Sequence, residues 1–395
     1  MPDYKNFNFD ITHRDPNSKA RCGVLNTPHG AIETPNFIFC ATKGALKGIT
    51  TAQAREAGVD IILSNTYHMM LQPGSEIVAK NGGLHRFLDW DGPMFTDSGG
   101  FQIFSLGHGG IANEIKGKRQ MGKARDNVNI TEEGAYFKSY IDGKVHLLTP
   151  EVSMQVQKNL GADLVVVLDE CTPFHTDKNY TERSMHMSHR WALRSLKEFD
   201  RLDDGSQSLY GIVQGGVYED LRKVSAEFVA EMPFFGQAVG GSLGGSKEQM
   251  HDVVGLASTY LNPTRPTHLL GIGGFSDIWN GVSLGMDTFD CTHPTRVARH
   301  GAALIHPSKG EGREHLNMKN SRFKEDLSPI DADCPCYCCQ KFTRSYIHHL
   351  LKAGELLSGQ LLSIHNVSFM MRVAREVREA LKAGRFEEAK REWCG

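Results

Sequence analysis

The feature that most constrains this 395-residue chain is a set of eight short apolar or β-branched runs separated by helical patterns. The predicted strands are 37–41, 60–64, 93–96, 163–168, 209–213, 237–240, 267–271 and 286–289. Strands that alternate with helices pair in parallel, and eight such units are typical of a closed barrel. The sequence therefore predicts an α/β fold with a (β/α)8 barrel.

Two stretches depart from this alternation. Residues 106–148 are rich in glycine and charge and are too long for a connection, so we expect a small sheet or a mobile lid there. Beyond Ala303 the alternation stops, and helical patterns follow at 344–356 and 366–389. We expect a barrel over residues 1–303, with an insertion at 106–148, and a second unit over 304–395 whose helices pack on the barrel.

The cysteines predict a metal site in the second unit. Their number, nine, is odd, and four of them crowd into Cys334-Pro-Cys336-Tyr-Cys338-Cys339. Three thiolates need a fourth ligand for tetrahedral zinc, and the candidates are Cys338, His348, His349 and His365. Adjacent Cys338 and Cys339 cannot easily both reach one ion, so a histidine from a following helix is favoured. The zinc is predicted to be structural.

The overall charge and hydropathy exclude several classes of protein. Lys and Arg number 44 against 46 Asp and Glu, so any polyanion must bind a local patch. Residues 291–325 form such a patch, with seven basic and three acidic residues. No apolar run approaches the roughly 18 residues that span a bilayer, and residues 1–10 lack a secretion signal. We therefore expect a soluble, cytoplasmic protein.

Polar residues follow seven of the predicted strands, where a barrel gathers its functional groups on one face. They are Asn65, Asp97, Asp169, Gln214, Gly240, Gly271 and Asp290. Single residues of these types also stop strands or cap helices. Two carboxylates in one cavity, such as Asp97 and Asp290, suit displacement at an anomeric carbon, where one attacks and the other moves protons.

The glycine-rich run 238–245 favours a ligand held against the backbone. No Gly-Lys-Ser/Thr completes a nucleotide-binding loop there. A flat heterocycle fits at least as well, because Asp169 and Gln214 are natural partners for the N–H and C=O groups of a guanine-like ring.

Several of these motifs together resemble a known family. They are Thr96-Asp97-Ser98-Gly99-Gly100-Phe101-Gln102, Leu168-Asp169-Glu170-Cys171-Thr172-Pro173, Gly211-Ile212-Val213-Gln214-Gly215, Ala238-Val239-Gly240-Gly241, Phe289-Asp290-Cys291 with Pro294-Thr295-Arg296, and Cys334/Cys336/Cys339 with Ile364-His365-Asn366. From about Arg21 to the last helix the chain resembles the tRNA-guanine transglycosylases, or queuine tRNA-ribosyltransferases.

The resemblance implies an irregular (β/α)8 TIM barrel with a zinc subdomain, in a homodimeric enzyme. Such an enzyme exchanges the wobble guanine of GUN-anticodon tRNAs (Asp, Asn, His, Tyr) for queuine or its 7-aminomethyl-7-deazaguanine precursor. By motif position it implies the following roles: Asp290 as nucleophile; Asp97 as general acid/base; Asp169, Gln214, Ser98, Gly241 and Ser242 on the base edge; Phe101 and Leu270 on the base faces; Arg296 and Arg299 on tRNA; and Cys334, Cys336, Cys339 and His365 on zinc.

Departures from the usual bacterial pattern concern the base pocket. Gly244 and Ser246 stand where bacterial members typically have Val and Glu, so we expect more room near the 7-substituent and favour queuine. Gly274 replaces a usual lysine, whereas Cys171 keeps the bacterial pattern.

Two other functions remain open from the sequence. A non-catalytic tRNA-binding subunit is disfavoured because both Asp97 and Asp290 are present. A metal-dependent barrel hydrolase would need histidines at the end of the first strand, and Ile38-Phe39-Cys40 offers none.

Overall fold

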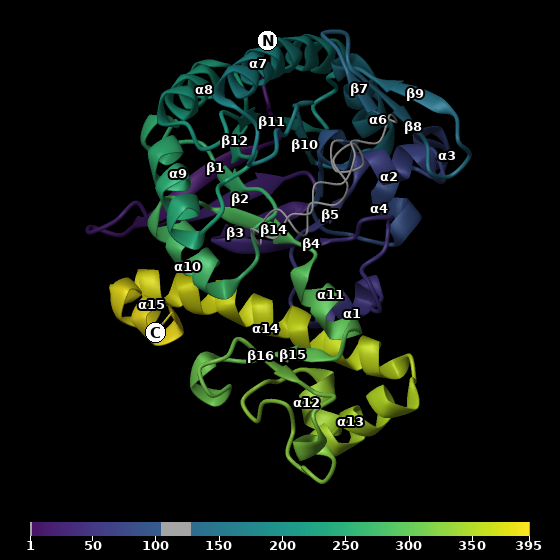
Figure 1. The fold of residues 1–395 in the computed structure, drawn as a ribbon, viewed down its shortest axis with the longest axis vertical. Helices are drawn as coiled ribbons and strands as arrows, with labels where there is room; N and C mark the ends of the chain where they lie inside the picture. Colours follow the sequence, from purple (N-terminus) through teal and green to yellow (C-terminus); the bar gives the residue numbers. More distant parts are fainter. Residues whose placement is uncertain (1, 104–127, 395) are drawn as a thin grey trace.

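The computed structural model describes residues 2–103 and 128–394 and contains the predicted barrel (Figure 1). Its eight parallel strands close in the order β4-β5-β6-β10-β11-β12-β13-β14. Their bounds are β4 Asn36–Cys40, β5 Ile62–Ser64, β6 Met94–Thr96, β10 Leu164–Val166, β11 Ser208–Val213, β12 Gly236–Val239, β13 Thr267–Leu269 and β14 Thr288–Cys291. Each corresponds to a predicted strand, and β14 closes the barrel by pairing Phe289 with Phe37 of β4.

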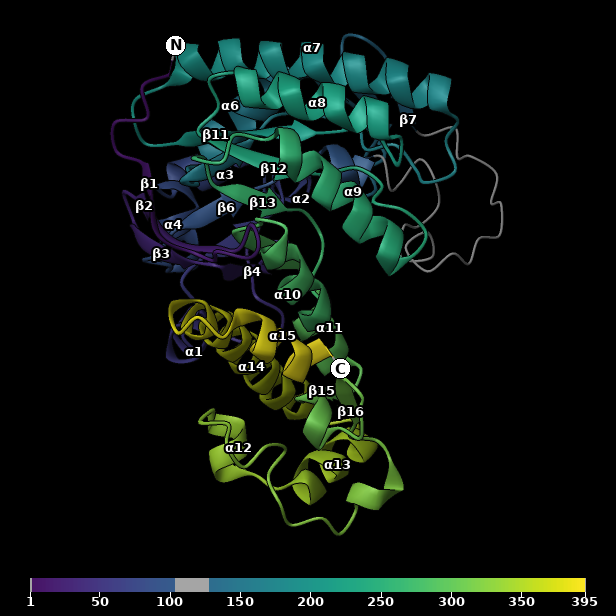
Figure 2. The same cartoon turned by 90° about the vertical axis from the view of Figure 1, so that its left-hand side faces the viewer.

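Helices follow the strands and cover the outside of the barrel (Figures 1 and 2). They are α1 Thr51–Glu56, α2 Thr66–Leu71, α3 Ser75–Lys80, α4 Gly83–Leu88, α6 Pro150–Leu160, α7 Lys178–Leu202, α8 Glu219–Glu231, α9 Lys247–Tyr260, α10 Phe275–Ser283 and α11 His293–Arg299. Start and stop signals explain α6: Thr149 accepts a hydrogen bond from the Val152 amide, Pro150 takes the first turn, and Gly161 ends the helix at φ 70°.

A three-stranded antiparallel sheet that the sequence analysis did not predict precedes the barrel. It consists of β1 Asn8–Arg14, β2 Arg21–Thr27 and β3 Gly30–Thr34. Arg21 of β2 forms a buried bidentate ion pair with Asp287, which directly precedes β14, at 2.8 and 2.6 Å. This pair joins the added sheet to the end of the barrel where the strands begin.

The insertion contains a second small antiparallel sheet. A small sheet was one of the two structures expected there. Its strands are β7 Val128–Ile130, β8 Ala135–Lys138 and β9 Val145–Leu148. Phe137 and Leu148 of this sheet pack with Tyr67 and Trp191 in a cluster separate from the main core. The expected lid falls largely on residues 104–127, which lie outside the described residues.

The chain after the barrel contains a two-stranded sheet and four α-helices. These elements are β15 Ala302–Leu304, β16 His315–Asn317, α12 Tyr337–Lys341, α13 Arg344–Ala353, α14 Leu357–Lys382 and α15 Phe386–Cys394, with 3-10 turns at Pro307–Lys309 and Ser321–Phe323. The helix predicted over 366–389 is wrong as one element, because the chain turns at Gly384, with φ 66°, between α14 and α15.

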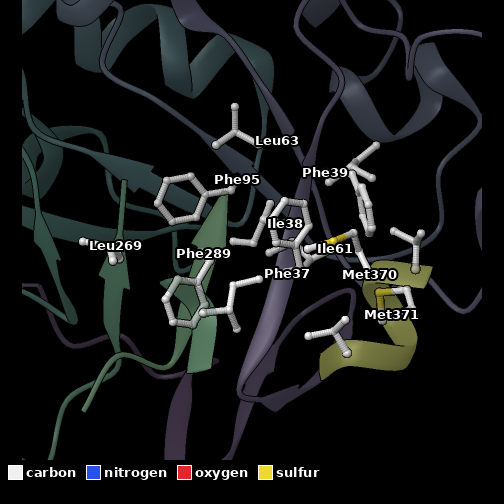
Figure 3. Packing of buried hydrophobic residues seen from close by; sticks show 14 of the residues in the cluster. Phe37, Ile38, Phe39, Ile61, Leu63, Phe95, Leu269, Phe289, Met370 and Met371 are labelled. Carbon is white, nitrogen blue, oxygen red and sulfur yellow. The ribbon is translucent and has the colours of Figure 1, made fainter. Parts of the chain in front are cut away.

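Helix α14 connects the two parts of the molecule. It runs between the barrel and the region of α12 and α13, as both views show (Figures 1 and 2). Met370 and Met371 of α14 lie beside the aromatic residues Phe37 and Phe39 of β4 (Figure 3). The buried hydrophobic cluster is continuous from the barrel into the cysteine-rich region.

Among the described helices, none combines the length and the apolar character needed to cross a bilayer.

Candidate active site

Asp290 lies at the carboxyl end of the last barrel strand, β14. It contacts strand β4, strand β13 and the loop that follows β13. Its Oδ1 accepts a hydrogen bond from the Gly271 amide at 2.8 Å and lies 3.2 Å from His268 Nε2. Its Oδ2 lies 3.5 Å from the Cys40 thiol, which donates to it. His268 is fully buried, and its Nδ1 contacts Thr288 Oγ1 at 2.9 Å. These contacts orient a carboxylate that is 9% exposed.

Asp97 follows β6 and accepts hydrogen bonds from three donors. The Thr66 amide donates to Oδ1 at 2.8 Å, and the side-chain amides of Gln102 (2.7 Å) and Asn65 donate to Oδ2. Burial raises the pKa of Asp97 to about 6; the three donors act in the opposite direction, and the negative charge of Asp290 adds to the rise. Asp97 and Asp290 thus lie within electrostatic reach of each other, as the barrel geometry predicted. A carboxyl group with this pKa can give and take protons near neutral pH.

Asp169 and Gln214 form a second polar pair at the ends of the neighbouring strands β10 and β11. Gln214 Nε2 donates to Asp169 Oδ2, and Ser98 Oγ donates to Asp169 Oδ1 at 3.2 Å. Burial raises the pKa of Asp169 to about 6. Gln214 Oε1 is buried without a hydrogen-bond partner among the described residues. An unpaired acceptor beside a carboxylate suits the N–H groups of a heterocycle.

The glycine-rich loop after β12 packs tightly against this pair. A Cβ at Gly241, where φ is 74°, would collide with Gln214 Oε1. Arg222 of α8 is fully buried and donates to the carbonyl oxygens of Gly216 (2.6 Å), Gly240 (2.7 Å) and Ser242 (2.9 Å). One side chain therefore fixes the loops that follow both β11 and β12.

Gly244 lies against the side chain of Gln249. A Cβ there would lie 2.6 Å from Gln249 Oε1, which accepts a hydrogen bond from the Gly245 amide at 3.0 Å. A side chain at Gly244 would therefore require Gln249, at the start of α9, to move. The expectation of more room near the 7-substituent stays a prediction.

The two residues expected on the base faces lie on different strand ends. Phe101 follows Asp97 and is 46% exposed. Leu270 follows β13 and is half-buried, packed against the main core and close to Gly240.

The two arginines expected to meet tRNA lie on α11, directly after Asp290, and both are exposed. Other cations of the basic stretch are engaged within the chain: Lys309 pairs with Asp331 and Asp333, and Arg322 pairs with Glu311 at 2.8 Å. Only part of the predicted patch is therefore free for a polyanion.

Cys334, Cys336, Cys339 and His365 form one buried cluster whose ligand atoms lie within 4.8 Å of one another. His365 Nδ1 lies 3.2 Å from Cys339 Sγ and 3.8 Å from Cys336 Sγ. The Leu304 carbonyl 2.8 Å from Nε2 fixes the ring so that Nδ1 faces the thiols. Of the other candidates, Cys338 lies outside the cluster, His348 contacts the Met318 carbonyl, and His349 is exposed. The Cys3His set can bind a metal ion and is compatible with zinc.

Sequence reasoning missed the partners that hold the site together. His268 lies in the middle of β13 and Arg222 lies within α8, so the strand-end rule selects neither; Cys40 ends β4, but a cysteine is not one of the residue types that the rule selects. The sequence did carry a signal for Arg222, which is an arginine within an amphipathic helix. An arginine that is buried in such a helix requires several hydrogen-bond acceptors.

The fold and the site define the class of protein: a (β/α)8-barrel enzyme with two carboxylates at the carboxyl ends of its strands and a separate Cys3His cluster. Comparison with known proteins supplies the family. The sequence model described as "Queuine tRNA-ribosyltransferase" matches residues 15–395. A queuine tRNA-ribosyltransferase of Roseiflexus sp. (strain RS-1) is 47% identical over 397 aligned residues, which cover 98% of this chain and 99% of that protein.

Other relatives agree. A queuine tRNA-ribosyltransferase of Chlamydia trachomatis serovar L2 is 44% identical and covers 94% of this chain and 98% of its own length. A queuine tRNA-ribosyltransferase of Synechococcus elongatus is 42% identical, and the alignment covers 98% of this chain and 94% of that protein. The chain belongs to the queuine tRNA-ribosyltransferase family, the tRNA-guanine transglycosylases, which are pentosyltransferase enzymes. The alternative of a metal-dependent hydrolase is thereby set aside.

Proposed function

We propose that this enzyme exchanges the wobble guanine of GUN-anticodon tRNAs (Asp, Asn, His, Tyr) for queuine or its 7-aminomethyl-7-deazaguanine precursor. The observation that carries the proposal is the placement of Asp97 and Asp290 after the barrel strand β6 and within β14, with the Asp169–Gln214 pair at the ends of two other strands of the same barrel. Two carboxylates of different environment provide a nucleophile and an acid/base group. The adjacent amide and carboxylate provide partners for the edge of a guanine-like base.

In the proposed reaction, Asp290 is the nucleophile. Its carboxylate oxygen forms a bond to the ribose C1′ as the C1′–N9 bond to guanine breaks, and Asp97 gives its proton to the departing base. The incoming base then loses its N9 proton to Asp97 and attacks C1′, which releases Asp290. The covalent intermediate keeps the tRNA attached between the two steps, so ping-pong kinetics are expected.

The base is proposed to lie between Phe101 and Leu270, with its edge on Asp169, Gln214, Ser98 and the backbone of Gly241 and Ser242. The unpaired Gln214 Oε1 supports this assignment. The surroundings of Gly244 are proposed to face the 7-substituent, where the side chain of Gln249 limits the space.

We propose that Arg296 and Arg299 bind tRNA phosphates. Both are exposed on α11, the helix that begins three residues after the proposed nucleophile. A target base in an anticodon loop is already unpaired. Binding of the neighbouring phosphates by the two arginines therefore suffices to place the nucleotide at the site. This substrate also favours a cytoplasmic location.

The Cys3His cluster is proposed to hold one structural zinc ion per chain. Zinc would supply no chemistry to the reaction; it would hold the loop at Cys334–Cys339 against α14 through His365.

We divide the chain into the barrel, 1–303, and the zinc subdomain with its helices, 304–395. We propose a homodimer that packs near this subdomain.

Single-turnover exchange with purified tRNA tests the proposed function. We expect labelled guanine to be displaced from the wobble position by queuine, by the aminomethyl base, or by both, and the ratio of the two rates identifies the preferred base. A tRNA without guanine at that position is the control. Exchange limited to guanine itself, or equal in the control tRNA, would contradict the proposal. Binding without any exchange would instead support a non-catalytic subunit.

A further inference from the structure

A second group of metal-ligand side chains lies at the end of the barrel opposite the active site. His29 is in the turn between β2 and β3, His85 is in α4, and Asp163 directly precedes β10. Asp163 Oδ1 lies 2.6 Å from His29 Nδ1, and Asp163 Oδ2 lies 3.1 Å from His85 Nε2. All three ligand atoms lie within 4.8 Å of one another.

The carboxylate of Asp163 needs positive charge close to it. The side chain is fully buried, and one of its oxygens already accepts a hydrogen bond from the Met94 amide at 2.8 Å. Within residues 2–103 and 128–394, its ion-pair partners are His29 and His85. A buried carboxylate is stable as an anion only when it is paired or bound to a metal.

The two imidazole rings restrict how that charge is supplied. They stack with their centroids 3.6 Å apart and their planes at 14°. If both were protonated, two like charges would be in contact, which is unfavourable at this distance in partly buried surroundings. A single proton, or one divalent cation between the rings and the carboxylate, avoids this repulsion.

We propose that His29 Nδ1, His85 Nε2 and Asp163 Oδ1 form a second metal site, which takes zinc or a similar borderline divalent ion and completes its coordination with water. Two imidazoles and one carboxylate are a common ligand set for such ions. Metal bonds of about 2.0–2.2 Å place neighbouring ligand atoms roughly 3.3 Å apart in a tetrahedral site. His29 Nδ1, which lies 2.6 Å from Asp163 Oδ1, must therefore move away from it when the ion binds.

Metal binding requires one small movement. Parallel rings cannot both direct an in-plane lone pair at the same ion, so one ring must turn. His29 is the ring that can turn, because its side chain is 40% exposed, whereas that of His85 is 12% exposed. The bound metal would join the β2–β3 turn to α4 and to the start of β10. This site stands apart from the proposed reaction and does not depend on it.

Metal counting on the intact enzyme tests the site. The protein is purified with its Cys3His cluster loaded, dialysed against micromolar zinc, and analysed for total metal. We expect the wild type to hold one more equivalent than the variants His29→Gln and His85→Gln. The matched control is His186→Gln, an exposed histidine on α7, which should keep the wild-type content.

Two further readouts make the outcome decisive. In a separate sample, loaded at the Cys3His cluster but not dialysed against zinc, added cobalt should give d–d absorption without thiolate charge-transfer bands, because the proposed ligands contain no sulfur. Zinc should raise the melting temperature of the wild type and of the control but leave that of His29→Gln unchanged; this exposed residue can be replaced without disturbing the core. A wild type that holds no extra zinc, or a His29→Gln variant that holds as much, would overturn the proposal and leave a proton as the shared cation.

Discussion

At the scale of single residues, the environment of each carboxyl group decides its role. Asp290 accepts one backbone hydrogen bond and contacts His268 and Cys40, which orient both of its oxygens. Asp97 has three donors, yet burial and the charge of Asp290 still raise its pKa to about 6. The proposed division of attack and proton transfer between the two groups rests on this difference in surroundings.

The pKa of Asp97 predicts opposite pH dependences for the two half-reactions. Departure of guanine needs the protonated form, so the rate constant of adduct formation should fall about tenfold per pH unit above about pH 6. Entry of the new base needs the ionised form, so its rate constant should fall below that pH. Single-turnover measurements on tRNA without added base, and on the isolated adduct with base, resolve the two. If the rate constants of both half-reactions fell in the same direction of pH, another group would have to move the proton.

At the scale of elements, a buried ion pair helps to hold the N-terminal sheet β1–β3 on the barrel. Asp287 accepts hydrogen bonds from Arg21 and from the Thr267 amide and is fully buried. The variant Arg21→Leu should lower the free energy of unfolding by about 3–5 kcal/mol, since it leaves a buried carboxylate without its cation. Urea unfolding measures this change. Arg14→Leu, on the exposed face of β1, is the control and should change stability by less than about 0.5 kcal/mol. Equal effects of the two variants would contradict the assignment.

The Cys3His cluster should determine the stability of the region around α12 and α13. The variant Cys336→Ser removes one proposed ligand, so the protein should lose the metal of this cluster and its C-terminal region should unfold at lower temperature. Metal analysis and thermal unfolding test this. Cys338→Ala, at a buried cysteine outside the cluster, should keep the metal. Retention of metal by Cys336→Ser would show that the ligand set is wrong.

At the scale of the whole molecule, the barrel was predictable because parallel strands buried on both faces are continuous apolar runs, as Asn36–Cys40 illustrates. The strand-end rule then located Asp97, Asp169, Gln214 and Asp290, since a closed barrel brings all strand ends together. The sheet β1–β3 was not predicted. Its first strand, β1, alternates between half-buried and exposed positions and has no apolar run.

The packing around the site was less predictable, for a physical reason. Arg222 of α8 donates to the loops that follow both β11 and β12, as far as Ser242, 20 residues further along the chain. Such contacts depend on how α8 docks on the barrel, and local patterns carry no information on that docking. The same holds for His268, whose role follows only from the register of β13 on β14.

The central claim is that Asp290 forms the bond to ribose, and mapping the trapped adduct tests it most directly. Enzyme incubated with tRNA in the absence of an incoming base is denatured, digested with nuclease and protease, and analysed by mass spectrometry. We predict a nucleotide attached through ribose C1′ to Asp290, and no adduct in Asp290→Ala, which should still bind tRNA. An adduct on Asp97 or any other residue, or one that persists in Asp290→Ala, would contradict the account.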